Sequence, residues 1–147
     1  MTVTKNPEVR ITRRFDAPAE RVFDAWLDPR LAVRWLFRSP DGEEVTAAID
    51  ARVGGRFQVV AHRPDGPITH VGEYRVIERP TKLVFTFAVP QFSPEHDLVT
   101  IAIRRLDKGC ELTLVNEMSP AIFAEWGEKT QEGWGQMLDG LATALEA

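Results

Sequence analysis

The sequence predicts a single α+β domain, in which a curved antiparallel sheet of about seven strands packs against two short helices and a long C-terminal helix. Three observations support this prediction. Several segments alternate apolar and polar residues, as half-buried strands do. Turn residues separate consecutive strands as in hairpins, which favours an antiparallel meander over a parallel sheet with crossovers. The last segment instead repeats its apolar residues at three- and four-residue steps, as an amphipathic helix does.

Composition limits what this domain can do. With 147 residues the chain has the usual size of one domain, so we expect a single domain over residues 1–147. Eighteen Lys and Arg residues against 22 Asp and Glu residues give a formal charge of −4 and form no basic stripe, so we expect no nucleic-acid partner. The sequence contains neither an apolar signal segment nor a run of membrane-spanning length, so we expect no membrane partner and a cytoplasmic location.

The first strand is predicted over Glu8–Phe15, where apolar and charged residues alternate. Asp16 then stands where the N-cap of a helix is expected, and Pro18 falls near the first turn. Asp28 begins a second short helix in the same way, since Pro29 follows it. Apolar residues recur at helical spacing in both helices: Val22, Phe23 and Trp26 in the first, and Leu31, Trp35 and Leu36 in the second.

Six more strands are predicted in the middle of the chain, over residues 45–51, 56–62, 68–78, 82–89, 98–106 and 110–117. Gly54 and Gly55 indicate a turn with unusual backbone angles. The stretch PDGP over residues 64–67 predicts another turn, and Pro80 ends the strand that follows it. A tight hairpin is predicted over residues 107–109, with Gly109 in the left-handed conformation.

The last helix is predicted to start at Ser119 and Pro120, a capping residue followed by a residue suited to the first turn. Its apolar face comprises Phe123, Trp126, Thr130, Trp134, Met137, Leu138, Leu141 and Leu145. The helix also contains glycines, each of which weakens it by roughly 1 kcal/mol relative to alanine. We therefore expect it to depend on packing against the sheet, and a break near Gly127 stays open.

Alternation also predicts which side chains face the interior. On the strand over residues 68–78 the inward residues are His70, Gly72, Tyr74 and Val76. Gly72 would leave volume between bulky neighbours, and His70 and Tyr74 would add polar groups; together these three residues suggest a small-molecule cavity, although for each residue alone a place in the core is favoured. A filled core with satisfied polar residues remains the alternative. The predicted ligand-binding residues are Trp35, Phe57, Val59, His70, Tyr74, Phe85, Phe87, Ile101, Trp126, Trp134, Met137 and Leu138.

Four stretches of the sequence, in order, resemble a known family: ITRRFDAPAERVFDAWLDPRLAVRW, IDARVGGRF, GEYRVIERPTKLVFTF and GWGQMLDGLATAL. They are similar to homologues of the activator of the heat-shock chaperone ATPase, and the similarity runs from about Val9 to Leu145. That family belongs to the START-related, polyketide-cyclase-like SRPBCC superfamily, which has the helix-grip fold. The resemblance implies a β-α-α-β6-α order with the long helix lying across a curved sheet.

The resemblance also implies a chaperone as a partner and a role in the stress response. In the eukaryotic co-chaperone of this family, a separate N-terminal domain is needed to stimulate the chaperone. The first strand predicted here begins within ten residues of Met1. We therefore expect that domain to be missing and rank chaperone binding below small-molecule binding.

We identify no catalytic or cofactor-binding motif in the sequence. Cys110, the single cysteine, follows a turn and begins a strand, so it is interpreted as a core residue. No group of His, Cys, Asp or Glu has the spacing of metal ligands, and the adjacent His96 and Asp97 are too weak a signal. Gly54 and Gly55 lack the rest of a phosphate-binding motif. We expect no metal and no cofactor, and assign no catalytic residue.

Three functions are therefore weighed. The first is a binding module for an apolar or aromatic small molecule, in which His70 and Tyr74 orient a polar end. The second is an enzyme of the cyclase or dehydratase type, which the resemblance to the superfamily implies, in which one of these two side chains moves protons. The third is a chaperone-interaction module that uses the outer face of the sheet or the first helices, where Arg10, Arg14, Glu73 and Arg75 lie. The sequence favours the first, in a monomer or a homodimer.

Overall fold

The computed structural model of the protein describes residues 6–39 and 42–146. In chain order the elements are β1 (Glu8–Phe15), α1 (Ala19–Leu27), α2 (Pro29–Ala32), β2 (Glu44–Ile49), β3 (Arg56–Arg63), β4 (Gly66–Glu78), β5 (Lys82–Phe87), β6 (Asp97–Arg105), β7 (Cys110–Glu117) and α3 (Pro120–Glu146). This order confirms the predicted α+β class and the predicted succession of strands and helices.

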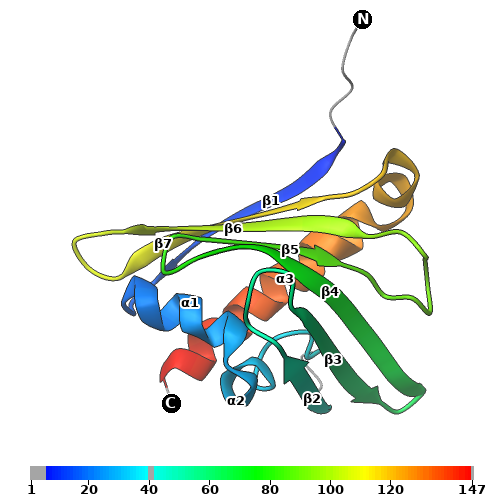
Figure 1. The fold of residues 1–147 in the computed structure, drawn as a ribbon, viewed down its shortest axis with the longest axis horizontal. Coiled ribbons are helices and arrows are strands. Elements are labelled where there is room, and N and C mark those ends of the chain that lie inside the picture. Colours follow the sequence, from blue (N-terminus) through cyan, green and yellow to red (C-terminus); the bar gives the residue numbers. More distant parts are fainter. Residues whose placement is uncertain (1–5, 40–41, 147) are drawn as a thin grey trace, which may run out of the picture.

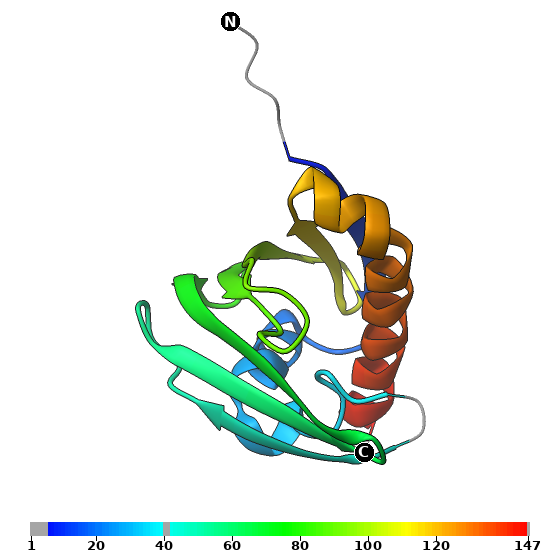
Figure 2. The ribbon, with the colours of Figure 1, turned by 90° about the vertical axis from the view of Figure 1, so that its right-hand side faces the viewer.

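Within the described residues, seven strands form one antiparallel sheet in the order β1-β7-β6-β5-β4-β3-β2. Strands β2 to β7 each pair with their neighbours in sequence, which confirms the meander, and β1 pairs with β7. The sheet curves, and α3 runs along its open side (Figures 1 and 2). Helices α1 and α2 occupy the space between α3 and the sheet near the C-terminal end of α3. The other end of that space, beside the first half of α3, is left to loops and side chains.

The first helix begins later than predicted. It starts at Ala19, and the N-cap is Pro18, which makes no side-chain capping bond. The carbonyl of Pro18 accepts the backbone N–H groups of Arg21 and Val22, at 3.0 and 3.1 Å. The predicted cap at Asp16 is wrong, because Pro18 is itself extended, with ψ 149°, and delays the helix.

The cap of the second helix is confirmed. The Asp28 carboxylate accepts the backbone N–H of Arg30 at 2.9 Å. The helix ends at Ala32, however, so Trp35 lies in the turns that follow rather than in the helix. Its indole N–H donates to the Ala25 carbonyl at 3.1 Å, and this bond fixes the ring in the core without helical backbone.

A bulge on β4 changes which residues face the core. The pairing of β4 with β5 shifts between Tyr74 and Val76. After the shift Ile77 packs against the core, while Val76 lies outside the core cluster. The predicted inward position of Val76 is therefore wrong, because one extra residue in a strand turns the following side chains to the other face.

Gly72 does not leave empty volume, contrary to the prediction. A Cβ atom at this position would lie 1.9 Å from the carbonyl oxygen of Thr86 and 2.4 Å from a ring carbon of Phe57. The Phe57 ring and the neighbouring strand thus already fill the space that a larger side chain would need. The glycine permits close packing, and it is not the origin of a cavity.

The long helix is continuous through Gly127. The Ser119 hydroxyl accepts the backbone N–H of Ile122 at 3.4 Å, as a capping residue does, so the predicted start is confirmed. The residues of α3 that are buried against the rest of the molecule are Gly127, Trp134, Leu138, Leu141 and Leu145. Packing therefore holds the helix together despite its glycines.

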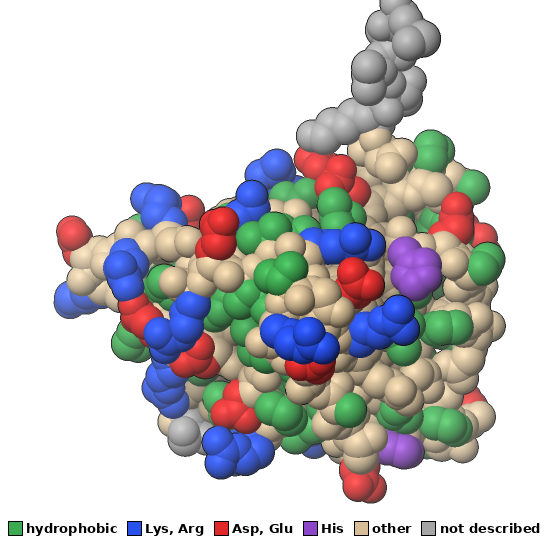
Figure 3. Space-filling view, in the orientation of Figure 1, with side chains coloured by type: hydrophobic (Ala, Val, Ile, Leu, Met, Phe, Trp, Pro, Cys, Tyr) green, Lys and Arg blue, Asp and Glu red, His purple; other side chains and the backbone are tan. Residues whose placement is uncertain are grey.

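The surface carries charges of both signs. Basic and acidic side chains are interspersed on the face in Figure 3 rather than gathered by sign. On the outer face of the sheet, Glu111 lies 2.9 Å from Arg104 and 3.6 Å from Arg14. Among the described residues, no helix combines the length and the apolar character needed to cross a membrane.

Candidate functional site

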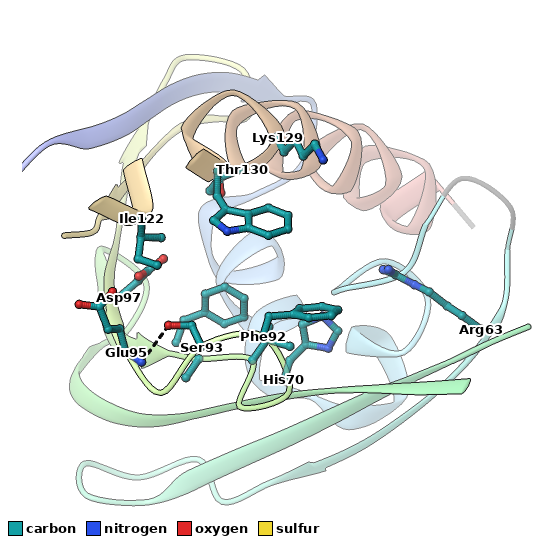
Figure 4. Close-up of a pocket in the computed structure, with 13 residues that line it drawn as sticks. Arg63, His70, Phe92, Ser93, Glu95, Asp97, Ile122, Lys129 and Thr130 are labelled. Carbon is teal, nitrogen blue, oxygen red and sulfur yellow. Dashed lines mark hydrogen bonds between the residues drawn. The ribbon is translucent and has the colours of Figure 1, made fainter. Parts of the chain in front are cut away.

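A cavity of about 300 Å³ opens beside the first half of α3, opposite the loop that joins β5 to β6 (Figure 4). Its apolar lining is Phe87, Ala88, Val89, Phe92, Ile122 and Trp126. Its polar lining is Arg63, His70, Ser93, Glu95, Asp97, Lys129 and Thr130.

A second hollow, of about 200 Å³, continues the cavity along α3. It shares Arg63, His70, Phe87 and Thr130 with the first and adds Phe37, Arg38, Ser39, Gly133, Trp134, Gln136 and Met137. We call the two hollows together the groove. Because α1 and α2 fill the opposite end of the space under α3, the groove lies where the sheet and the helix have no helix between them.

Two aromatic rings from opposite walls meet in the cavity. Phe92, on the β5–β6 loop, and Trp126, on α3, lie nearly parallel, with ring centroids 6.3 Å apart and planes 22° apart. Phe92 is 62% exposed, which is unusual for so large an apolar side chain. The pair offers flat apolar surface that an aromatic ligand could cover.

His70 is the buried polar residue at the centre of the groove. It is 6% exposed, and its ring stacks on Phe37 with centroids 4.2 Å apart. Its Nδ1 lies 3.0 Å from the carbonyl oxygen of Val59, which can only accept, so Nδ1 carries the proton. Burial lowers the pKa of His70 to about 4. The imidazole is therefore neutral near pH 7, and Nε2 remains as an acceptor.

A buried hydrogen-bond chain orients Asp97 at one end of the groove. The indole N–H of Trp134 donates to Asn116 Oδ1 at 2.9 Å, and Asn116 Nδ2 donates to Asp97 Oδ2 at 3.0 Å. Asn116 is fully buried, so both of its polar groups depend on these partners. The chain links α3, β7 and β6 and holds the Asp97 carboxyl group at the groove.

Glu95 lies beside Asp97 at the same end (Figure 4). Its Oε2 accepts the Ser119 hydroxyl at 2.9 Å, and its backbone N–H donates to Ser93. Partial burial raises the pKa of Asp97 most; the bond from Asn116 and the charge of His96 oppose this rise, and the Glu95 charge adds to it. Two carboxyl groups thus lie side by side at this acidic end.

The opposite end of the groove is basic. Arg63 Nε lies 3.4 Å from a carboxylate oxygen of Glu43, whose side chain is 6% exposed. Burial opposes ionisation of Glu43, but hydrogen bonds from Ser39 and Arg63 outweigh it and lower its pKa to about 2. The Arg63 charge is therefore paired. Lys129 stands over the Trp126 ring, 5.1 Å from its centroid, at the rim.

The residues predicted to bind a ligand divide into two groups. His70, Phe87, Trp126, Trp134 and Met137 line the groove. The others lie in the packed core: Trp35, Phe57, Val59, Tyr74, Phe85, Ile101 and Leu138. Four of these, Phe57, Val59, Tyr74 and Phe85, surround a void of only about 10 Å³, which is the size of one water molecule rather than of a ligand.

Several groove residues were not predicted from the sequence. Phe92, Glu95 and Asp97 lie in or next to the loop between β5 and β6, and Lys129 lies on α3 outside the apolar positions that predicted this helix. The one signal in the sequence was an aromatic residue within the Pro-bounded loop over residues 90–97. Loops often carry the specific contacts of a site that a rigid scaffold positions.

The described residues offer little for nucleophilic or metal chemistry. No group of three or more His, Cys, Asp or Glu among them could hold a metal ion. Cys110 is buried, as predicted, and burial raises the pKa of its thiol, so it is not a thiolate near neutral pH. Burial and then the charge of Asp50 raise the pKa of Tyr74, which also lies away from the groove.

The sequence matches a family model described as Activator of Hsp90 ATPase homolog 1-like protein, over residues 16–146. Comparison with curated proteins gave no match.

Many solved structures share this architecture. A protein from Chromobacterium violaceum is 27% identical, with a TM-score of 0.79 over 97% of this chain and 99% of that one. A protein from Nitrosomonas europaea is 21% identical, with a TM-score of 0.82 over 95% and 94% of the two chains. An AHSA1-like protein from Aeromonas hydrophila is 23% identical, with a TM-score of 0.78 over 95% and 92%. These similarities establish the helix-grip fold.

Proposed function

Because this chain belongs to the family of Activator of Hsp90 ATPase homolog 1-like proteins, which it matches over residues 16–146, we propose that it binds a small, largely apolar and aromatic molecule in the groove. The observation that carries this proposal is the cavity of about 300 Å³ between α3 and the β5–β6 loop. Its size is at the lower end of small-molecule sites, which are mostly apolar and hold a few placed polar groups.

The composition of the groove supports binding over a passive gap between elements. Phe87, Phe92 and Trp126 supply flat apolar surface, and His70 supplies a polar atom that burial keeps uncharged. A ligand ring would cover the exposed face of Phe92 and remove its apolar area from water, at about 25 cal/mol per Å². Apolar contact would thus provide affinity, and the polar residues would select the orientation.

An enzymatic role has narrower support. Of the two side chains considered for proton transfer, His70 lines the groove, whereas Tyr74 borders the small core void. A neutral imidazole could accept a proton from a bound molecule. Family membership is also compatible with chaperone contact. The size and lining of the groove favour a small molecule, so small-molecule binding is the function we propose.

The proposal can be tested with N-phenyl-1-naphthylamine, an uncharged aromatic dye whose fluorescence rises in apolar surroundings. We expect saturable binding to the wild type. Thr130→Phe places a ring in both hollows and should weaken binding about ten-fold or more, which corresponds to about 1.4 kcal/mol. The matched control is Gln131→Phe, which adds the same side chain at an exposed neighbouring position of α3 and should leave binding unchanged.

Both variants should first be shown to unfold cooperatively near the wild-type Tm, because the dye also binds partly unfolded proteins. The proposal fails if the wild type gives no saturable signal. It also fails if Thr130→Phe and Gln131→Phe bind the dye as the wild type does.

A further inference from the structure

The polar groups of the groove narrow the class of ligand. We propose that the groove selects an aromatic molecule that carries a protonated amine, with the amine at Glu95 and Asp97 and the ring against Phe92 and Trp126. This inference rests on the proposed function and names the chemistry of its ligand.

The acidic end contains carboxylate oxygens that could accept hydrogen bonds from a ligand. Asp97 Oδ2 accepts a hydrogen bond from Asn116, and Glu95 Oε2 accepts one from Ser119. The second oxygen of each carboxylate has no hydrogen-bond donor among the described residues. Each carboxylate is thus held in place by one hydrogen bond, with its other oxygen left for a ligand. An ammonium group can donate to both carboxylates at once, and hydrogen bonds to charged groups are the stronger ones.

His70 provides a second and independent acceptor. It is more than nine-tenths buried, it lines both hollows, and its proton is committed to the Val59 carbonyl through Nδ1. The atom it can offer to a ligand, Nε2, therefore accepts rather than donates. His70, Asp97 and Glu95 thus all favour a ligand that donates hydrogen bonds.

The two cations of the cavity do not reverse this preference. The Arg63 guanidinium lies at the end of the cavity opposite Glu95 and Asp97 (Figure 4), where the Glu43 carboxylate pairs with it. Lys129 lies over the face of Trp126. The indole face attracts this ammonium group and holds it at Trp126, away from Glu95 and Asp97.

The ring of the ligand has a defined place. Phe92 and Trp126 are nearly parallel with centroids 6.3 Å apart. A ring inserted between two others needs about 7 Å, or two contacts of about 3.5 Å each. A small outward movement of the loop that carries Phe92 would admit it, whereas a ring packed on one face of the pair needs no movement.

The test compares three probes with one ring system: 2-(1-naphthyl)ethylamine, 2-(1-naphthyl)ethanol and 1-naphthylacetate, which are cationic, neutral and anionic at pH 7. Isothermal titration calorimetry at low salt gives each Kd. We expect the amine to bind about ten-fold or more tightly than the alcohol, and the acid to bind most weakly.

Asp97→Asn tests the assignment of the amine to the acidic end. It removes the charge and keeps an oxygen that can accept from Asn116, so the fold should persist. In this variant the Kd of the amine should approach the Kd of the alcohol, because the negative charge that favours the amine is gone. Glu95→Gln is a second variant with the same expected direction. Glu125→Gln, at an exposed position of α3 outside the groove lining, is the control and should retain the wild-type order.

Two sets of results separate this inference from the proposed function. Equal binding of the three probes, or tighter binding of the acid, overturns the amine assignment and leaves a site for aromatic molecules. Unchanged preference for the amine in both Asp97→Asn and Glu95→Gln overturns it as well. If none of the three probes binds and the uncharged dye does not bind either, both the proposed function and this inference are wrong.

Discussion

At the scale of single residues, the burial of His70 affects both the stability of the fold and the polar group that the groove offers to a ligand. It is buried, uncharged near neutral pH, and tied through Nδ1 to the Val59 carbonyl. A histidine that had been left in solvent would titrate near pH 6.5 and would offer either nitrogen to a ligand. Burial thus fixes the charge of the imidazole that a ligand meets, and the hydrogen bond to the Val59 carbonyl fixes its tautomer.

His70 should make stability fall in acid. The unfolded chain takes up a proton at this residue below about pH 6.5, whereas burial lowers the pKa of the folded state to about 4. Between these values the unfolded state binds more protons, so the free energy of unfolding decreases as the pH falls, by up to about 3 kcal/mol. Urea unfolding at pH 7 and pH 4.5 should show a smaller difference for His70→Phe than for the wild type. His62→Phe, at an exposed position, should behave as the wild type does.

Two glycines offer opposite predictions for one substitution. Gly72→Ala should destabilise the protein by about 1–3 kcal/mol, because its Cβ would overlap the Thr86 carbonyl and the Phe57 ring. Gly133→Ala should stabilise it by about 0.5–1 kcal/mol, because Gly133 is helical and nothing lies within 4 Å of its Cβ position. Thermal unfolding should therefore show a lower Tm for Gly72→Ala and a higher Tm for Gly133→Ala. Similar Tm changes in the same direction would contradict this account of the packing.

At the scale of elements, the junction of α3 with β6 and β7 depends on a polar contact inside an apolar interface. Trp134 contributes a large buried ring, and its indole N–H meets the fully buried Asn116 on β7. Asn116 in turn holds Asp97 at the start of β6. Buried polar groups are costly unless they are paired, so this chain fixes how the helix and the two strands meet.

A double-mutant cycle should reveal this contact. Asn116→Leu leaves the Trp134 N–H unpaired and should lower the free energy of unfolding by about 1–3 kcal/mol. Trp134→Phe removes the donor, and the double variant should lose less than the sum of the single losses, with a coupling of about 0.5–3 kcal/mol. Urea unfolding of the four proteins measures it. Additivity within about 0.3 kcal/mol would show that the hydrogen bond contributes no stability.

At the scale of the whole molecule, the position of the groove follows from how the space under α3 is filled. Helices α1 and α2 pack at one end, where Trp26 and Trp35 meet edge to face with ring centroids 4.6 Å apart. The other end is bordered by the β5–β6 loop, by side chains of α3 and by strand residues such as Arg63 and His70. The sheet curves and α3 runs along its open side (Figure 2), and the groove is the volume that the side chains leave at this end.

The sequence by itself determined the class of the fold and nearly every element. Alternation, turn residues and helical spacing depend on neighbours close in the chain, and they placed β1, β7 and α3 within a residue or two. Local rules were less reliable where a distant contact intervenes. The bulge that turns Ile77 inward depends on pairing with β5, and the extended Pro18 replaces the expected cap at Asp16.

The apolar, aromatic-lined site predicted from the sequence was a set of inward-facing residues. Only the tertiary structure showed which of them line the groove and which pack in the core. Phe57, Tyr74 and Phe85 pack against one another because the curved sheet closes around them, and His70, Phe87 and Trp126 lie farther along, where the volume remains open. Asp97 and Trp134, which are 37 positions apart, meet through Asn116. Periodicity tells which face a side chain takes, but the space left between the faces depends on curvature and on what else packs there, and these are properties of the whole fold.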